Sequence, residues 1–362
     1  MNNRRTLLSA LCAATAAAQG LLWSQPVWAK RIQASKALGI SDDLADRLRF
    51  GWLGRSDVQE FISDLAQRQD ISRQWIEDQF RLLGVQPRAL ALMNPPPPRA
   101  DEPPRRRSWA RYLAQHADLS RVRKGREFID QYRDTFERVS KKTGVPDTVI
   151  AAIIGVETKY GQITGRFPVL ETLTTLAFES PRRTEFFKGE LESALIMGHQ
   201  GVIDLQRTQG SFAGALGLPQ FMPSSWRNFA VSHEGLSPPD LLNNTQDAIA
   251  SVANFLVAHG WRAGEPSHTP ALIPANTKVA HFVAPKLSPI HTVAQLEQSG
   301  IAQALPRLSP DTKASLIDLP EADGSVLYWI ASHNFFVVTQ YNRSFMYAAA
   351  VLTLSEQIAA AD

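Results

Sequence analysis

Hydrophobic and polar positions alternate with a helical period over most of this chain. Within residues 30–92, the segments DVQEFISDLAQRQ and RQWIEDQFRLLG place apolar residues three and four positions apart. This is the spacing of one face of a helix. The same spacing returns over residues 109–143, where the apolar face comprises Phe128, Tyr132, Phe136 and Val139. These patterns predict helices that pack through one apolar face.

The helix predicted over residues 147–161 ends at a glycine and carries a carboxylate on its apolar face. Ile150, Ile153 and Ile154 occupy positions i, i+3 and i+4, and position i+7 holds Glu157. Burial among apolar neighbours raises the pKa of a carboxyl group, and a glutamic acid still protonated near neutral pH can act as a general acid. Glu157 is therefore a candidate catalytic residue. The competing interpretation is a structural glutamate paired with an arginine or with backbone amides.

Two more stretches of the central region carry candidate chemistry. Arg182 and Arg183 open a predicted helix, where a capping cluster is favoured over an anion clamp. Residues 210–226, GSFAGALGLPQFMPSSW, combine glycines with the polar Ser211 and Gln220 and with aromatic rings. Glycines let backbone approach a ligand closely, and polar groups between apolar rings suit a sugar. By itself, this stretch is better explained as a tight structural turn.

The pattern changes towards the C-terminus. Residues 247–259 predict another amphipathic helix;. Beyond Trp261, the segments 272–285 and 334–341 read as strands, and TVAQLEQSG, residues 292–300, as one short helix. A final helix is expected within residues 341–361. Together these elements predict a mainly α (α+β) fold.

Composition sets the size of the core. The chain has 362 residues, of which 44% are hydrophobic and 20% charged. This is enough for one large domain or two to three small ones, and it argues against wholesale disorder. Residues 94–107 contain six prolines and cannot form a regular helix. They predict a surface arm.

The N-terminus resembles a targeting segment. Arg4 and Arg5 precede an apolar run over residues 7–23. Val27 and Ala29, small or medium-sized residues, occupy the −3 and −1 positions of a cleavage site. This pattern predicts a signal peptide over residues 1–29, cleaved after Ala29, and a periplasmic location. The paired arginines weakly resemble a twin-arginine signal. A signal retained as a membrane anchor is the alternative.

Removal of this segment changes the cysteine count and the charge. Cys12 is the only cysteine, so the remaining chain has no disulfide, no thiolate nucleophile and no cysteine metal site;. Residues 1–29 hold two of the 38 basic residues and none of the 35 acidic ones, which leaves 36 basic against 35 acidic residues. The remaining balance of +1, with no basic helix, gives no indication of nucleic-acid binding.

Three motifs in order carry a family resemblance. GVETKYG, GSFAGALGLPQFMPSSW and DAIASVANFLVAHGW resemble the lytic murein transglycosylase B family, as do the PRR before FF and the late QYNRSFMY. The resemblance runs from about Trp109 to the C-terminus. It implies cleavage of peptidoglycan between N-acetylmuramic acid and N-acetylglucosamine without water, leaving a 1,6-anhydro end. It also implies a lysozyme-like helical core flanked by a helical domain and a small β-containing domain.

On this basis the domain boundaries can be predicted. The helical domain would span residues 30–144 with the proline-rich arm, the lysozyme-like catalytic core residues 145–262, and the small β-containing domain residues 263–338. Residues 339–362 would return to the core as a turn and a helix.

The resemblance also implies roles for individual residues. Glu157 would be the single catalytic acid/base, and Ser211 would hydrogen-bond the N-acetyl group of the substrate. The remaining residues implied to line the glycan groove are Gln220, Arg182, Arg183, Tyr112, Tyr341, Asn342 and Tyr347. Phe255 stands where family members often have a tyrosine, so one hydroxyl contact is missing.

Metal and cofactor sites are not expected. Some family members carry a calcium loop where this chain has VSHEGLSPPDLLNN, which lacks the acidic spacing that wraps the ion;. The expected partner is the peptidoglycan strand, bound by a monomer. Proteins of cell-wall synthesis or division are candidate partners, and the sequence identifies none of them.

Two other functions remain open. An ordinary glycosidase uses two carboxylates, and neither Glu171 nor Asp204, nearby in sequence, lies in a context that suggests a second one. This absence favours assistance by the acetamido group of the substrate. The alternatives are a hydrolytic muramidase on the same fold and a non-catalytic peptidoglycan-binding protein, although the presence of Glu157 counts against the latter.

Overall fold

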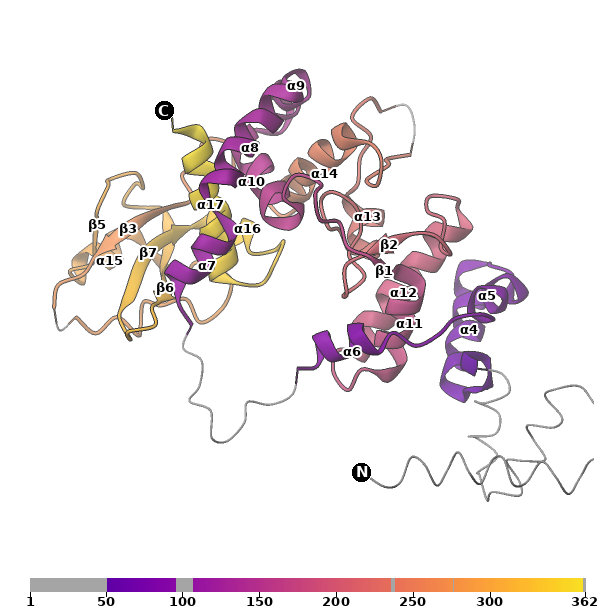
Figure 1. Cartoon of the computed structure of the whole chain (residues 1–362). Helices are drawn as coiled ribbons and strands as arrows, with labels where there is room; N and C mark the ends of the chain where they lie inside the picture. The colour runs from indigo at the N-terminus through magenta and orange to yellow at the C-terminus, as the bar shows by residue number, and fades with distance from the viewer. Residues whose placement is uncertain (1–50, 96–106, 236–237, 276, 361–362) are drawn as a thin grey trace, which may run out of the picture. The chain divides into compact units, whose positions relative to one another are not determined.

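The computed structural model describes residues 51–95, 107–235, 238–275 and 277–360. The predicted signal peptide and most of the proline-rich arm lie outside these residues. The chain divides into two compact units, one ending at Gly84 and the other beginning at Val85. Among the described residues helices predominate in both units, and the second unit also contains a small sheet, so the predicted mainly α (α+β) class is confirmed (Figure 1).

The first unit contains the two helices predicted from its periodicity. They are α4 (Ser56–Gln69) and α5 (Arg73–Phe80), preceded by a 3-10 turn, η1 (Gly51–Gly54). The apolar faces of both helices are buried, with Ile62 and Ile76 inaccessible to solvent. The indole Nε1 of Trp52 donates to the carbonyl of Gly84 at 3.1 Å. This bond joins the beginning and the end of the described residues of the unit.

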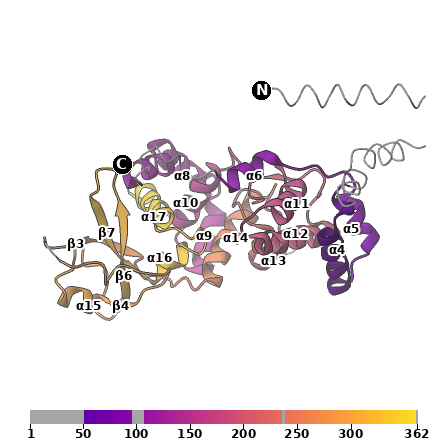
Figure 2. The same ribbon diagram turned by 90° about the horizontal axis from the view of Figure 1, so that it is seen from below.

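One helix, α10 (Asp147–Thr158), lies at the centre of the second unit. It packs against α8, α9, α14 and α17 (Figures 1 and 2). The bounds of the surrounding helices are α7 (Trp109–His116), α8 (Leu119–Gln131), α9 (Arg133–Thr143), α14 (Thr245–Ala258) and α17 (Phe345–Ala359). The isoleucines on the predicted apolar face of α10 are fully buried. The helix that carries Glu157 is therefore held on several sides.

A second group of helices leads to and from the glycine-rich stretch. It comprises α6 (Pro87–Met93), α11 (Val169–Glu179), α12 (Thr184–His199) and α13 (Pro223–Phe229). The strands β1 (Phe167–Pro168) and β2 (Gln209–Gly210) pair antiparallel and join the ends of α10 and α12 to these helices. This pairing brings the chain after Glu157 beside the start of the glycine-rich stretch.

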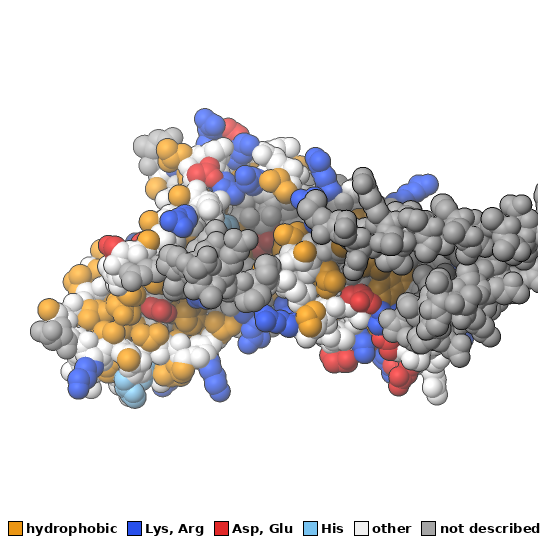
Figure 3. All heavy atoms as spheres, turned by 60° about the horizontal axis from the view of Figure 1, so that its bottom comes forward, with side chains coloured by type: hydrophobic (Ala, Val, Ile, Leu, Met, Phe, Trp, Pro, Cys, Tyr) orange, Lys and Arg blue, Asp and Glu red, His pale blue; other side chains and the backbone are white. Residues whose placement is uncertain are grey.

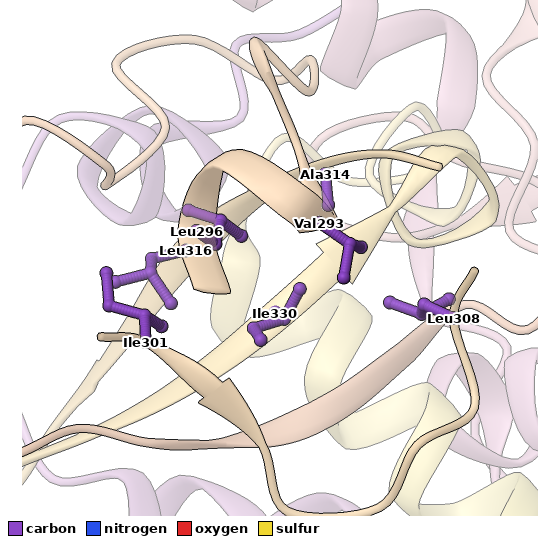
Figure 4. Packing of buried hydrophobic residues seen from close by; sticks show 7 residues of the cluster. All are labelled: Val293, Leu296, Ile301, Leu308, Ala314, Leu316 and Ile330. Atoms are coloured by element: carbon purple, nitrogen blue, oxygen red, sulfur yellow. The ribbon is translucent and has the colours of Figure 1, made fainter. Parts of the chain in front are cut away.

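The small sheet has five antiparallel strands in the order β4-β6-β7-β3-β5. Their bounds are β3 (His268–Leu272), β4 (His291–Thr292), β5 (Ala302–Gln303), β6 (Lys313–Pro320) and β7 (Val326–Ser332). The predicted short helix is α15 (Val293–Gln298), which opens with a capping box of Thr292 and Gln295. It covers the sheet with a buried apolar cluster that includes Val293, Leu296 and Ile330 (Figure 4).

Two strand predictions were wrong. Residues 334–341 fall largely in a helix, α16 (His333–Val338), in which the residues from Asn334 to Val338 are all buried. A run buried on every side shows no periodicity that distinguishes a helix from a strand. Residues 272–285 are mostly irregular, with one bridge between Val283 and Leu316. Among the described residues, none of the helices combines the length and the apolar character needed to cross a membrane.

Candidate active site

Glu157 lies in the last turn of α10, where the backbone turns sharply. The helix ends at Thr158, before the predicted glycine stop. Lys159, Tyr160 and Gly161 follow with positive φ angles of 51°, 58° and 87°. Two consecutive non-glycine residues in this region are uncommon, and such strain persists only where surrounding contacts hold it.

Contacts from neighbouring elements hold this turn. The hydroxyl of Tyr160 donates to the carbonyl of Arg121 at 3.0 Å, and Nε of Arg121 donates to the carbonyl of Gly155 at 3.3 Å. The ring of Tyr160 packs so closely on Gly155 that a Cβ there would lie 2.6 Å from ring atom Cζ. Thr158 Oγ1 donates to the carbonyl of Leu218 at 3.0 Å. The position of Glu157 is thereby tied to α8 and to the glycine-rich stretch.

Among the described residues, the carboxyl group of Glu157 has one hydrogen-bond partner. The hydroxyl of Tyr347, in the first turn of α17, donates to Glu157 Oε1 at 2.6 Å. Burial raises the pKa of Glu157 from 4.5 to about 7, against the lowering effect of this hydrogen bond;. Among the described residues, no second carboxylate contributes to this shift. The elevated pKa predicted from the apolar stripe is confirmed.

Three tyrosines surround this carboxyl group. The pKa values of Tyr112, Tyr341 and Tyr347 are all raised, by burial and by the nearby negative charge of Glu157. The rings of Tyr341 and Tyr347 stack with centroids 6.4 Å apart, and the hydroxyl of Tyr341 donates to the carbonyl of Pro219 at 2.6 Å. Three of the predicted groove residues thus lie near Glu157, one from α7, one from the turn before α17 and one from the first turn of α17.

Ser211 is oriented by the turn that follows β2. Its Oγ accepts hydrogen bonds from the backbone amides of Ala213 and Ala215 at 3.3 and 3.0 Å. Both bonds use the oxygen as an acceptor, and within the described part of the chain the hydroxyl proton has no acceptor of its own. A half-buried hydroxyl with a spare proton can donate to a carbonyl oxygen of a ligand;.

Gln220 supports the glycine-rich stretch from within. Its backbone has a φ of 52°, and its side-chain amide donates to the carbonyls of Thr164 and Gly217 at 3.1 and 2.9 Å. The nitrogen is therefore committed to the protein, whereas the side-chain oxygen remains a possible acceptor. The stretch is both a structural turn, as the simpler interpretation held, and a neighbour of the end of α10.

The other predicted site residues lie in different surroundings. Arg182 and Arg183 are exposed at the start of α12, where the guanidinium of Arg183 lies 4.0 Å from the ring centroid of Phe186;. Asn342 is exposed beside Tyr341. Phe255 is buried, with only 5% of its surface exposed, and its ring lies 4.9 Å from that of Tyr341. Phe255 therefore packs against Tyr341, one of the predicted groove residues.

Sequence reasoning missed two residues that position the site. Tyr160 lies within the GVETKYG motif itself, and Arg121 is a buried charge on α8. No periodicity indicates that these two side chains clamp Gly155. In the sequence, the one indication would have been an arginine, Arg121, at an apolar-face position of the helix, because charged residues are rarely buried without a partner;.

The loop that replaces the calcium loop is held by a carboxylate. Asp247 Oδ1 accepts from the backbone amide and Nδ1 of His233 at 2.8 and 2.9 Å, and Oδ2 accepts from the amide of Asp240 at 2.9 Å. Within the ranges that the structure describes, no three His, Cys, Asp or Glu side chains are grouped to hold a metal ion. These hydrogen bonds close the loop with protein groups alone.

Comparison with known proteins gives consistent matches. The family described as transglycosylase SLT domain matches residues 54–356. The chain is 35% identical over 308 residues to the membrane-bound lytic murein transglycosylase B of Escherichia coli (strain K12), which covers 84% of this chain and 83% of that protein.

Solved structures match over a similar range. The catenated lytic transglycosylase SltB1 from Pseudomonas aeruginosa aligns with a TM-score of 0.77 and 33% identity, covering 84% of this chain and 97% of that one. SltB3 from the same organism, in complex with NAG-NAM-pentapeptide, aligns with a TM-score of 0.72 and 27% identity, covering 84% of this chain and 80% of that one.

Proposed function

This chain belongs to the transglycosylase SLT family and is a lytic murein transglycosylase, and from its site we propose that Glu157 alone performs the proton transfers of a water-free cleavage. The substrate would be the bond between N-acetylmuramic acid and N-acetylglucosamine in peptidoglycan. The observation that carries this proposal is a single carboxyl group with a pKa near 7.

The first step would break the glycosidic bond. Protonated Glu157 donates its proton to the leaving oxygen, which departs as the 4-hydroxyl of N-acetylglucosamine. The acetamido oxygen of the muramic acid closes onto the anomeric carbon and takes the place of a protein nucleophile. The hydroxyl of Ser211, with its proton free to donate, would hold the N-acetyl group in position.

The second step would close the anhydro ring. The 6-hydroxyl of the muramic acid attacks the anomeric carbon, the acetamido group returns to its original form, and the carboxylate of Glu157 accepts the hydroxyl proton. This restores the acid for the next cycle. A tethered hydroxyl has an effective molarity of about 10⁵ M or more. It would outcompete water, because among the described residues no second carboxylate shifts the pKa of Glu157.

The protein groups around Glu157 suit both states of the carboxyl group. Burial favours the protonated acid before the first step;. The hydrogen bond from Tyr347 favours the carboxylate that the first step produces;. The groove would act on glycan strands in the periplasm, to which a cleaved signal peptide would direct the chain.

Product analysis tests the proposal directly. Purified peptidoglycan is digested in water enriched in heavy oxygen, and the released muropeptides are analysed by mass spectrometry. We expect 1,6-anhydromuramic acid ends that carry no label and are lighter by one water than hydrolysis products. Labelled reducing ends would identify the enzyme as a hydrolytic muramidase and overturn the mechanism.

Substitution of Glu157 tests the role of the acid. Glu157→Gln keeps the size of the side chain but removes its transferable proton, so activity should fall on the order of 100-fold to 10,000-fold. The melting temperature should stay close to that of the wild type. A folded variant with near-normal turnover would show that another group is the acid.

A further inference from the structure

A second concavity opens beside the tyrosines that surround Glu157. It has a volume of about 940 Å³ and is formed by the start of α7, the loop before β4, the end of β6 and the start of α17. We call it the basic pocket. The residues that define it here are Arg107, Arg111, Lys286, Arg343, Asp318 and Tyr112.

The charge of the basic pocket is strongly one-sided. Four cationic side chains line it, against the single carboxylate of Asp318, and all four cations are exposed. None of them forms an ion pair with another residue in the described part of the chain. By contrast, Arg55 and Arg68 pair with neighbouring aspartates. Figure 3 shows lysine and arginine side chains gathered in the middle of the face turned forward, next to hydrophobic side chains over the sheet.

The walls of the basic pocket are fixed by the fold. At the start of α7, Ser108 Oγ and the amide of Ala110 each donate to the carboxylate of Glu321 at 2.9 Å. On the opposite wall, the amide of Ala284 donates to the carbonyl of Leu316 in β6 at 2.9 Å. Cations carried on anchored elements form a preorganised binding surface.

The basic pocket continues into the active site. Tyr112 lines the pocket and also lies close enough to Glu157 to feel its charge. Met346, another lining residue, directly precedes Tyr347, whose hydroxyl donates to Glu157. A group attached to a sugar bound at Glu157 can therefore extend into the pocket.

We propose that the basic pocket binds the carboxylates of the stem peptide that muramic acid carries. This inference rests on the proposed function, because it takes the bound sugar to be muramic acid. In an intact strand the lactyl carboxyl group of muramic acid is bound in an amide to the peptide, so the free carboxylates belong to the stem peptide. Guanidinium groups bind carboxylates through paired hydrogen bonds, and a concave surface of one sign concentrates anions. The half-buried Phe345 and Met346 offer apolar contact for aliphatic parts of the peptide.

Charge reversal with a matched control tests the inference. The test variant is Arg111→Glu/Lys286→Glu. The control, Arg138→Glu/Lys278→Glu, changes the same residue types at exposed positions outside the pocket. Each is assayed on glycan strands with intact stem peptides and on the same strands after the peptide carboxylates have been converted to neutral amides.

The two substrates give distinct expected results. For the test variant, kcat/KM on peptide-bearing strands should fall about tenfold or more, since two attractive charge contacts become repulsive. On strands with amidated peptides it should change less than about twofold, and the control should stay near wild type on both. An equal loss on both substrates, or no loss on either, would overturn the inference.

A binding measurement separates this inference from the proposed function. In a Glu157→Gln background, calorimetry with free stem pentapeptide should show binding that the Arg111→Glu/Lys286→Glu change abolishes and the control change retains. Absence of binding in the background itself would refute the pocket assignment. If wild-type enzyme releases no anhydro ends from either substrate while this binding persists, the proposed mechanism fails and the pocket stands.

Discussion

Two opposing effects act on the pKa of Glu157. Burial removes the hydration of the carboxylate and raises the pKa, whereas the hydrogen bond from Tyr347 stabilises the carboxylate and lowers it;. The balance, a pKa of about 7, leaves the group ready to donate and to accept a proton near neutral pH;. The pKa near 7 thus depends on both side chains, because without the hydrogen bond from Tyr347 the pKa of Glu157 would be higher.

The pH profile should report this pair. The general acid must be protonated in the free enzyme, so kcat/KM should fall as the pH rises through about 7;. Tyr347→Phe removes the bond that lowers the pKa, so the falling limb should move to higher pH. Tyr341→Phe serves as the control, because its hydroxyl donates to the carbonyl of Pro219 and leaves the carboxyl group untouched. A limb that stays in place in the Tyr347 variant would contradict this account.

At the scale of elements, the end of α10 carries backbone strain;. Its last turn is followed by two non-glycine residues with positive φ, and the ring of Tyr160 occupies the space above Gly155. The glycine at position 155 is therefore a packing requirement for the tyrosine that holds the turn. A strained backbone of this kind persists only where the surrounding contacts hold it in place, and such places are often functional sites.

Gly155→Ala should disturb the site through this contact. The new Cβ would overlap the ring of Tyr160, so the ring must move and release the turn that carries Glu157. Because a misplacement of about 1 Å at a catalytic group can cost about 100-fold in rate, we expect kcat/KM to fall by about 10- to 100-fold. Gly189→Ala, on α12 with open space around the position, is the control and should leave activity unchanged. Equal behaviour of the two variants in activity and melting temperature would rule out the clamp.

The loop closed by Asp247 predicts independence from calcium. Its two carboxylate oxygens already accept three hydrogen bonds from His233 and Asp240. A chelator should therefore change neither the melting temperature nor the activity. Asp247→Ala should lower the melting temperature, because each unpaired amide costs about 1–3 kcal/mol. A fall in stability with chelator that calcium restores would show that the loop binds the ion.

At the scale of the whole molecule, the hydrophobic periodicity predicted the secondary-structure elements better than the tertiary contacts between them. The helix of Glu157 and its buried stripe follow from spacing alone. The approach of Tyr347 does not, because it depends on how α17 packs against α10. Helix α16 was missed because an apolar run buried on all sides has no readable period. The basic pocket was missed because its cations come from separate segments, and each one alone resembles a solvated surface residue.

The hydrogen bond between Tyr347 and Glu157 joins residues 190 positions apart. A chain emerging from the ribosome therefore contains Glu157 long before it contains the tyrosine that tunes its pKa. The tuned pKa of Glu157 can therefore arise only after α17 has been made and has packed against α10. Fragments that lose the last helix to a protease lose the same partner. The pKa of the acid is thereby set late in folding, and it changes as soon as the C-terminal helix is lost.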